Sequence, residues 1–430
     1  MLAWQALPML PAQLSDVGLH ASAARYGDLL IHGVIDLRRS FSRERIESAL
    51  RATIAEFPVL GCRYEQRWWR DRWRVVESPL SDCVHVVDEP ADLAEQTTAW
   101  VRRPLVTDRE RPLRIVSFNR NGGSRLLLSI THLAVDGAGV GAVAHVLGAH
   151  LYGVKPSLPV DQQRSVGGAL AGLRWYHLPV LARDLAGAAL LPLKVLRAAK
   201  RERQFPADAL SQANWRHMVV DAAELERIKA RCRPASINDA LIAALARVAA
   251  GRSSRGPLAV MYTMDLRRYS GAARLTAANT SSILTALVPR EAIGDLAATA
   301  VAVSAVTGRQ HRGLAGPAFI LGPLAISAGA PHVVARRITR WLHPVFVDLP
   351  LSRGLVFTNV GRLDEGLAAF GDDIEGLRAV GPNMVGVDVP AVVAFGFRGE
   401  LHLQLFSPPG LAVEALDELE AELKAALELG

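Results

Sequence analysis

The chain has 430 residues, of which half are apolar and 21% are charged, and its formal net charge at pH 7 is +7. This length and composition exclude a disordered or fibrous protein and predict a globular protein with two domains or two half-domains. The positive charge favours anionic partners, such as phosphate-bearing cofactors, acidic carrier proteins, membrane surfaces or nucleic acid, without choosing among them.

Cysteine usage and the first residues indicate the compartment. Cys62, Cys83 and Cys232 lack CxxC spacing, so neither a disulfide framework nor a cysteine zinc site is expected. The opening MLAWQALPMLPAQ has no basic region and contains two prolines, which argues against a signal peptide. We therefore expect a cytoplasmic protein, and the sequence leaves a peripheral contact with a membrane open.

The first third of the chain predicts a helix followed by the two strands of a hairpin. Ser42 is a natural N-cap, and apolar residues repeat at helical spacing from Ile46 to Phe57. Residues 63–66 and 73–76 alternate as paired strands do.

The loop of this hairpin lies in RWWRDRWR (67–74), which interleaves arginine with tryptophan. Proteins that bind single-stranded nucleic acid use such a pattern for stacking and phosphate contacts. Because strands flank the segment, we expect instead that its tryptophans pack over the sheet while its arginines face water. No nucleic-acid partner is expected.

Residues 125–131 (RLLLSIT) predict a strand with Leu126, Leu128 and Ile130 on one face. His132 has the same parity and stands at the end of this strand. Residues 139–151 then predict a helix of small residues.

A change of composition marks the segment from 156 to about 206, where apolar clusters alternate with basic residues. We interpret it as a helical crossover between two halves, with the basic residues on a solvated face. A membrane-surface or carrier-protein patch is the alternative. The basic residues are Lys194, Arg197, Lys200, Arg201 and Arg203.

The second half opens on a helix, because Ser236 is a natural N-cap and Asp239 follows three residues later, as in a capping box. Residues 258–267 predict a strand, and ALVPR, GLVFTNVG, VVAFGFRG and ELHLQLFS predict further strands before a C-terminal amphipathic helix. The pattern predicts layered α/β architecture, with an N-terminal half at 1–160, a crossover at 161–206 and a C-terminal half at 207–430.

The uncharged stretch 313–335 is long enough to cross a membrane. Prolines and glycines interrupt it, and strongly apolar residues are sparse, so we expect a buried or interface-facing helical segment.

Residues 131–137, THLAVDG, are the strongest candidate for a catalytic site. A neutral imidazole is the natural general base near pH 7, so His132 at a strand end is a candidate for that role. Asp136 either orients the imidazole or braces the loop, and the residues alone leave both roles open. A purely structural histidine is the remaining alternative.

THLAVDG resembles the HxxxDG signature of the CoA-dependent acyltransferase superfamily, which includes chloramphenicol acetyltransferase, plant BAHD enzymes, nonribosomal peptide condensation domains and bacterial wax ester synthases. Other segments resemble that superfamily in the expected order, over roughly residues 20 to 410. These segments are FPVLGCRYE, RPLRIVSF, SINDALIAALA, MDLRRY followed by NTSS, and FTNVGRL. Many relatives carry two histidines (HHxxxDG), whereas Thr131 stands at the first position here.

The resemblance implies two chloramphenicol-acetyltransferase-like α/β halves that form a pseudo-dimer with a tunnel between them. It implies that His132 is the general base for direct attack on a thioester, without an acyl-enzyme. It also implies that Asp136 turns away and pairs with Arg267, with Arg268 the less favoured partner. Gly137 would allow a tight turn or a close approach to substrate.

Substrate and oxyanion contacts are implied for the Gly137 amide and for Asn279, Thr280, Ser281 and Ser282. The resemblance further implies acyl-CoA or an acyl-carrier-protein thioester as co-substrate, and an alcohol or amine as acceptor. The apolar content favours a lipid-like or natural-product acyl group. For residues 313–331 we favour core packing over a role in lining an acyl-chain tunnel or touching a membrane.

No metal and no bound cofactor are expected, because the histidines lack metal-ligand spacing and neither a P-loop nor a dinucleotide-binding glycine motif is present. We expect a monomer. Two alternative functions stay open: a condensation-type enzyme that forms amides between carrier-bound substrates, and a non-catalytic binding module with the same fold.

Overall fold

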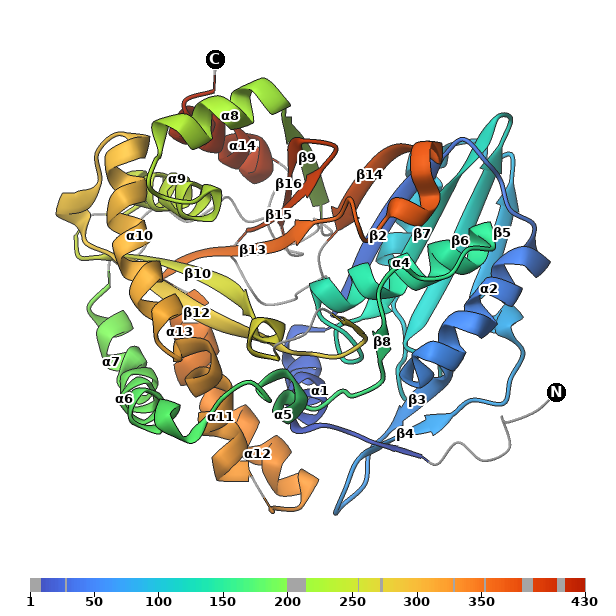
Figure 1. Cartoon of the computed structure of the whole chain (residues 1–430), viewed down its shortest axis with the longest axis horizontal. Helices are drawn as coiled ribbons and strands as arrows, with labels where there is room; N and C mark the ends of the chain where they lie inside the picture. The colour runs from blue at the N-terminus through green and yellow to red at the C-terminus, as the bar shows by residue number, and fades with distance from the viewer. Residues whose placement is uncertain are drawn as a thin grey trace.

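The computed structural model consists of two α/β halves that lie side by side (Figure 1). Each half is built around its own sheet, and a crossover segment connects them. The residues that the structure describes are 9–27, 29–198, 214–253, 255–270, 274–327, 329–351, 353–380, 390–407 and 414–429.

A five-stranded sheet forms the centre of the first half, within the described residues. In spatial order its strands are β14 (Ile374–Val380), β2 (Leu30–Leu37), β7 (Gly123–Thr131), β6 (Leu113–Arg120) and β5 (Val84–Asp88). The pairs of β7 with β2 and β6 are antiparallel, with Ile130 opposite both Ile31 and Leu113. Because β14 comes from the C-terminal half of the chain, it ties the two halves together.

Helices cover both faces of this sheet. They are α2 (Arg43–Glu56) and α4 (Gly137–Tyr152) on one face and α3 (Leu93–Arg102) on the other. The Ser42 side chain accepts a hydrogen bond from the Arg45 amide and so caps α2, as predicted. The predicted helix at 139–151 is confirmed as part of α4.

The predicted hairpin is confirmed and joins a small three-stranded sheet. Its strands are β1 (Leu10–Pro11), β4 (Arg72–Val75) and β3 (Cys62–Glu65). The prediction that its tryptophans pack over the sheet was wrong for two of the three. Trp73 is fully buried, but Trp68 and Trp69 lie in the turn and are 67% and 54% exposed. Strand alternation fixes the side that Trp73 faces, whereas the turn residues have no strand partner.

A six-stranded sheet forms the second half, within the described residues. In spatial order its strands are β12 (Ser281–Val288), β10 (Leu258–Asp265), β13 (Gly354–Arg362), β15 (Ala391–Phe397), β16 (Glu400–Ser407) and β9 (Asn214–Val220). Its helices are α8 (Ala222–Arg231), α9 (Ile237–Gly251), α10 (Leu296–Arg312) and α14 (Glu414–Leu427). Ser236 and Asp239 form the predicted capping box at the start of α9.

A layer of helices packs beside the second half. It comprises α1 (Leu14–Tyr26), α5 (Val166–Ala169), α6 (Leu178–Ala189), α7 (Leu191–Leu196), α11 (Ala315–Ser327), α12 (His332–His343) and α13 (Leu349–Leu351). The described part of the crossover, which ends at residue 198, contains the helices α5, α6 and α7 as predicted, and Lys194 and Arg197 are exposed. Lys200, Arg201 and Arg203 lie outside the described residues. Among the described helices, none combines the length and apolarity that crossing a membrane requires.

Short elements complete the chain. The two-stranded pairing of β8 (Val160–Asp161) with β11 (Leu275–Thr276) links the crossover to the second half. The short helical turns are η2 (Pro58–Gly61), η3 (Leu80–Asp82), η4 (Trp175–His177), η5 (Leu266–Tyr269), η6 (Arg290–Ala292), η7 (Pro344–Asp348) and η8 (Ala368–Asp373). The predicted architecture of two α/β halves is confirmed.

Candidate active site

His132 lies in the turn between β7 and α4. The strand holds it there because Leu126, Leu128 and Ile130 anchor β7 in the core, each at most 1% exposed. The backbone amide of His132 donates a 2.7 Å hydrogen bond to the carbonyl of Leu29. The start of the turn is therefore fixed from two sides.

A cavity of about 530 Å³ lies between the two halves, and His132 forms part of its wall. Strands from both sheets line it, together with α1, α4, α11 and α12. Most of the lining is apolar, including Phe319 and Ile320 of α11 and Val356 and Phe395 of the second sheet. Most described residues of segment 313–335 lie in helices α11 and α12, as expected, and α11 belongs both to the core and to the cavity wall.

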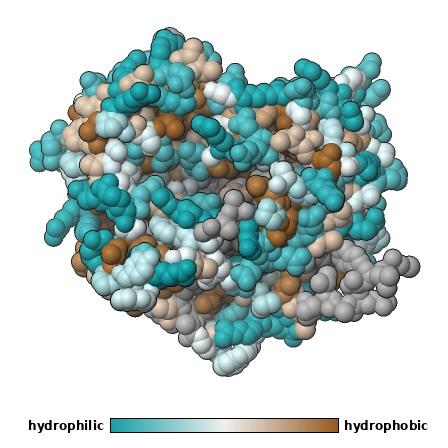
Figure 2. Space-filling model, in the orientation of Figure 1, coloured by the Kyte–Doolittle hydropathy of each residue, from teal (hydrophilic) through white to brown (hydrophobic). Residues whose placement is uncertain are grey.

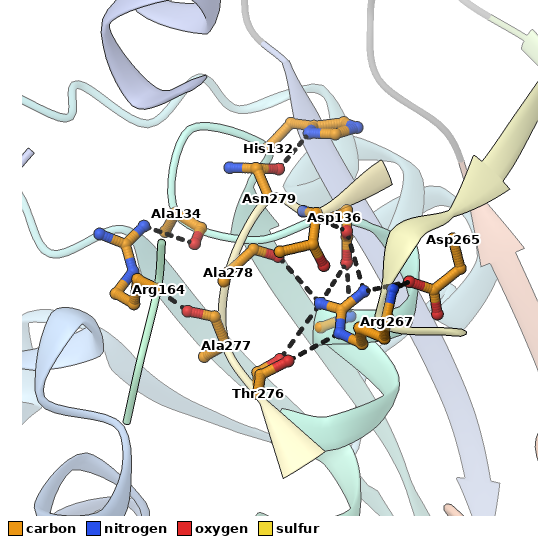
Figure 3. A network of polar contacts seen from close by, with 12 residues as sticks. His132, Ala134, Asp136, Arg164, Asp265, Arg267, Thr276, Ala277, Ala278 and Asn279 are labelled. Atoms are coloured by element: carbon orange, nitrogen blue, oxygen red, sulfur yellow. Dashed lines mark hydrogen bonds and ion pairs between the residues drawn. The ribbon is translucent and has the colours of Figure 1, made fainter. Parts of the chain in front are cut away.

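The Asn279 side chain fixes the tautomer of His132 (Figure 3). Its amide nitrogen donates to the Leu133 carbonyl at 3.1 Å, and that carbonyl can only accept. The Asn279 Oδ1 atom must then face His132, and it lies 3.1 Å from Nδ1. Nδ1 therefore carries the proton and donates it to Oδ1, which leaves Nε2 with a free lone pair.

Asp136 points away from His132 and binds Arg267 (Figure 3). The Arg267 Nη1 and Nη2 atoms lie 3.0 and 2.9 Å from the two carboxylate oxygens, a bidentate pair. Backbone amides of Gly139 and Thr280 donate to the same carboxylate at 2.8 and 2.9 Å. Four donors therefore surround the carboxylate of Asp136, and none of them belongs to the imidazole of His132.

The charge state of Asp136 follows from these contacts. It is only 2% exposed, and burial alone would raise its pKa. The charge and hydrogen bonds of Arg267, with the amides of Thr280 and Gly139, outweigh burial and lower the pKa below the ordinary aspartate value. Asp136 is therefore held ionised in the folded protein.

Arg267 joins the loop after His132 to residues close to itself in the sequence. Besides Asp136, it binds the Thr276 hydroxyl, the Ala278 carbonyl and the Asp265 carboxylate. The alternative partner, Arg268, lies beside His311 instead. The guanidinium therefore clamps the loop after His132 to the strand ends of the second half.

A second arginine clamp was missed by the sequence analysis. Arg164 donates to the carbonyls of Ala134 and Ala277, at 2.9 and 3.1 Å, and forms an ion pair with the buried Asp16. It thereby fixes the turn after His132 from the side opposite to Arg267 (Figure 3). Nothing in the local pattern around Arg164 distinguishes it from the other arginines of the crossover.

The four residues predicted to contact substrate differ in where their side chains lie relative to the cavity. Thr280 and Ser281 line the cavity, and the Thr280 hydroxyl is buried without a hydrogen-bond partner among the described residues. The side chain of Asn279 is occupied by His132 and Leu133. Ser282 lies on the other face of β12 and does not line the cavity. Its partner on the neighbouring strand β10 is Met264.

Gly137 has the first backbone amide of α4 and lines the cavity, but its backbone does not require glycine. Its φ angle is not in the left-handed region, and a Cβ atom there would make only an ordinary contact with Val360. Gly139 is the restricted position, because a Cβ atom would lie 2.9 Å from the Val135 side chain. The role expected of Gly137, a tight turn or a close approach to substrate, therefore stays a prediction.

Among the described residues, no group of three or more histidine, cysteine, aspartate or glutamate side chains could hold a metal ion. The polar groups of the cavity nearest His132 are instead hydroxyls and amides. Such an arrangement suits proton transfer and stabilisation of an oxyanion.

No protein-family model matches the chain, and no curated protein matches its sequence. Solved structures do match. The first condensation domain of the calcium-dependent antibiotic synthetase, in complex with a substrate analogue, has a TM-score of 0.68 at 16% identity, over 98% of this chain and 96% of that one.

Two further matches have similar scores. Trichothecene 15-O-acetyltransferase from Fusarium sporotrichioides has a TM-score of 0.67 at 13% identity, over 97% of this chain and 94% of that one. The starter condensation domain of rhizomide synthetase, in complex with C8-CoA, has a TM-score of 0.66 at 15% identity, over 98% and 94%. These matches are members of the CoA-dependent acyltransferase superfamily, so the resemblance predicted from the sequence is confirmed at the level of the fold.

Proposed function

We propose that the protein is an acyltransferase that moves an acyl group from a CoA or carrier-protein thioester to a hydroxyl or amine. The observation that carries this proposal is the fixed tautomer of His132, whose Nε2 lone pair is free at the wall of a cavity between the two halves. The fold supports it, since the starter condensation domain described above holds C8-CoA.

In the proposed reaction, His132 Nε2 takes the proton of the acceptor as its oxygen or nitrogen attacks the thioester carbonyl. The tetrahedral intermediate places negative charge on the former carbonyl oxygen. The Thr280 hydroxyl and the Gly137 amide are its proposed donors, because both belong to the cavity wall. The C–S bond then breaks, and the imidazolium returns its proton to the departing thiolate.

No acyl-enzyme is needed, because the cavity holds both substrates together and their positioning lowers the barrier. Asp136 and Arg267 act on this reaction only through the backbone. They hold the turn after His132 against the segment of Asn279 and Thr280.

The apolar cavity favours a long acyl chain. Because each buried methylene contributes about 0.8 kcal/mol, we expect kcat/KM to rise about fourfold per methylene until the cavity is filled. The measurement is product mass spectrometry with acyl-CoA thioesters from acetyl to palmitoyl, each with an alcohol and an amine acceptor. Equal turnover of acetyl and palmitoyl donors would contradict a lipid-like acyl group.

The same panel separates the alternative functions. An amide product from carrier-tethered donors alone would identify a condensation-type enzyme. Turnover of no donor, free or tethered, would overturn the proposed acyl transfer and leave a binding module.

Asn279 is a positioning residue, and its role has a separate test. We expect Asn279→Ala to lower kcat about 10–100-fold while KM stays unchanged, by analogy with the loss seen when the orienting partner of a metal-bound histidine is removed. Steady-state kinetics with a saturating acyl donor measure this separation of kcat from KM.

Asn119→Ala is the matched control for this variant. Asn119 is an amide on β6 that binds the exposed Asp88 and lies away from the cavity. A change in KM rather than kcat for Asn279→Ala would show that Asn279 binds substrate instead of orienting His132.

A further inference from the structure

The exposed aromatic side chains gather on a few elements. Among the described residues, the strongly exposed ones are Trp68, Trp69, Trp175, Tyr176 and Trp341. Trp341 is 78% exposed and lies on α12, whereas Trp68 and Trp69 form the tip of the β3–β4 hairpin. Large exposed indoles are costly in water and are typical of surfaces that meet a partner or a membrane interface.

The hairpin tip and α12 form one structural unit. The carbonyls of Trp69 and Trp68 accept hydrogen bonds from the first amides of α12, those of His332 and Val333, at 2.8 and 3.3 Å. These are amides that a helix cannot satisfy internally. The buried Asp71 adds an ion pair with Arg336 of α12. The backbone at the tip is thus used to cap the helix, while both indole rings remain exposed.

Helix α12 has two distinct faces. Ala335, Thr339 and His343, spaced four residues apart, line the cavity. Val334 and Trp341, seven residues apart, are exposed on the outer side with Arg337 between them. One helix therefore separates the apolar cavity from the surface.

The apolar surface continues onto neighbouring helices. Turn η7 follows α12 and packs against α7, and it exposes Val345. Helix α7 exposes Leu193 and Leu196. Figure 1 shows α6, α7, α11 and α12 along one side of the molecule, and Figure 2 shows brown apolar groups among teal ones over the part where α6 and α7 lie.

The charge of this surface is positive. Arg70, Arg337 and Arg340 are exposed, and none has an ion-pair partner among the described residues. Asp71 is buried and already neutralised by Arg336. Unpaired guanidinium groups beside exposed indoles match the phosphate and acyl layers of an anionic membrane surface.

We propose that the hairpin tip and α12 dock the protein on an anionic phospholipid surface. Tryptophan and valine side chains enter the interface, while the arginines contact lipid phosphates. Docking does not depend on acyl transfer. A second consequence rests on the proposed function: a lipid substrate would reach the cavity across α12, whose inner face lines it.

Sedimentation of the full chain with vesicles tests the docking. We expect binding to phosphatidylcholine vesicles that contain about one third phosphatidylglycerol, much weaker binding to phosphatidylcholine alone, and a loss with added salt. Arg337→Gln with Arg340→Gln should weaken binding about thirtyfold, since each arginine contributes about fivefold. Trp341→Ala and Trp68→Ala should each weaken it about tenfold.

The matched control neutralises two charges elsewhere. Arg227→Gln with Lys229→Gln lies on α8, at the opposite end of the molecule from α12 (Figure 1), and should leave binding unchanged. Equal losses in both double variants would overturn the proposal, because binding would then follow net charge alone. Binding to an acidic carrier protein but to no vesicle would also overturn it and identify a protein partner.

His132→Ala separates this proposal from the proposed function. That variant should bind vesicles as the unchanged protein does, whatever its turnover. Failure of acyl transfer and failure of docking are thus measured independently.

Discussion

Replacing His132 with alanine is expected to lower the rate of acyl transfer by about 10²–10⁴-fold, the contribution of a positioned general base. Among the described residues, the imidazole makes one side-chain hydrogen bond, to Asn279, so its removal leaves the clamps of Arg267 and Arg164 in place. The fold should persist. The measurement is kcat with the best donor and acceptor pair, together with circular dichroism.

His150→Ala is the control for this prediction. His150 lies near the end of the same helix α4 and binds Glu56, outside the cavity. Its replacement should leave kcat unchanged. A His132→Ala variant with full activity would remove the proposed base.

Replacing Asp136 with asparagine is expected to destabilise the protein by about 3–5 kcal/mol, because Arg267 would lose the partner that neutralises it in a buried site. Asp265 remains beside Arg267, but its side chain is 47% exposed. The free energy of unfolding from urea denaturation measures this loss. Adding Arg267→Met to the variant should recover part of it, as the removal of both charges does in other buried pairs.

The loss should also depend on pH. The pKa of folded Asp136 is below the ordinary value near 3.9, so its stabilisation is fully present above that value. It disappears as the pH falls through the lowered pKa of the folded protein. The difference in unfolding free energy between the unchanged protein and Asp136→Asn should thus be constant near neutral pH and shrink in acid.

Asp36→Asn provides a matched control in the first half. Asp36 binds Arg125 and Arg378, and these arginines keep its pKa low although burial opposes them. It should lower stability without changing the kcat of the folded fraction. Asp136→Asn should lower both, because the turn after His132 would shift. Equal kcat in the two variants would contradict the positioning role of Asp136.

Elements with local signals were predictable from the sequence. Ser42 and Ser236 cap helices because their hydroxyls reach amides three residues away, and such contacts depend on neighbours in the chain. The strand before His132 was equally clear, because its period-two apolar pattern fixes one buried face. The pairing of Asp136 with Arg267 had no local signal and followed only from the resemblance of two motifs.

The sequence by itself determined several of the helices and strands and the position of His132 at a strand end, since these follow from residues close along the chain. Only the tertiary structure decided which atoms meet at the site. Asn279 sets the tautomer of His132 from 147 positions away, and Arg164 clamps the same turn. Side chains alternate between the two faces of a strand, and Ser282 lies on the face of β12 that is turned away from the cavity. The sequence did not say which face of β12 would meet the cavity. Such contacts depend on how the two halves pack, and no periodicity along the chain encodes that.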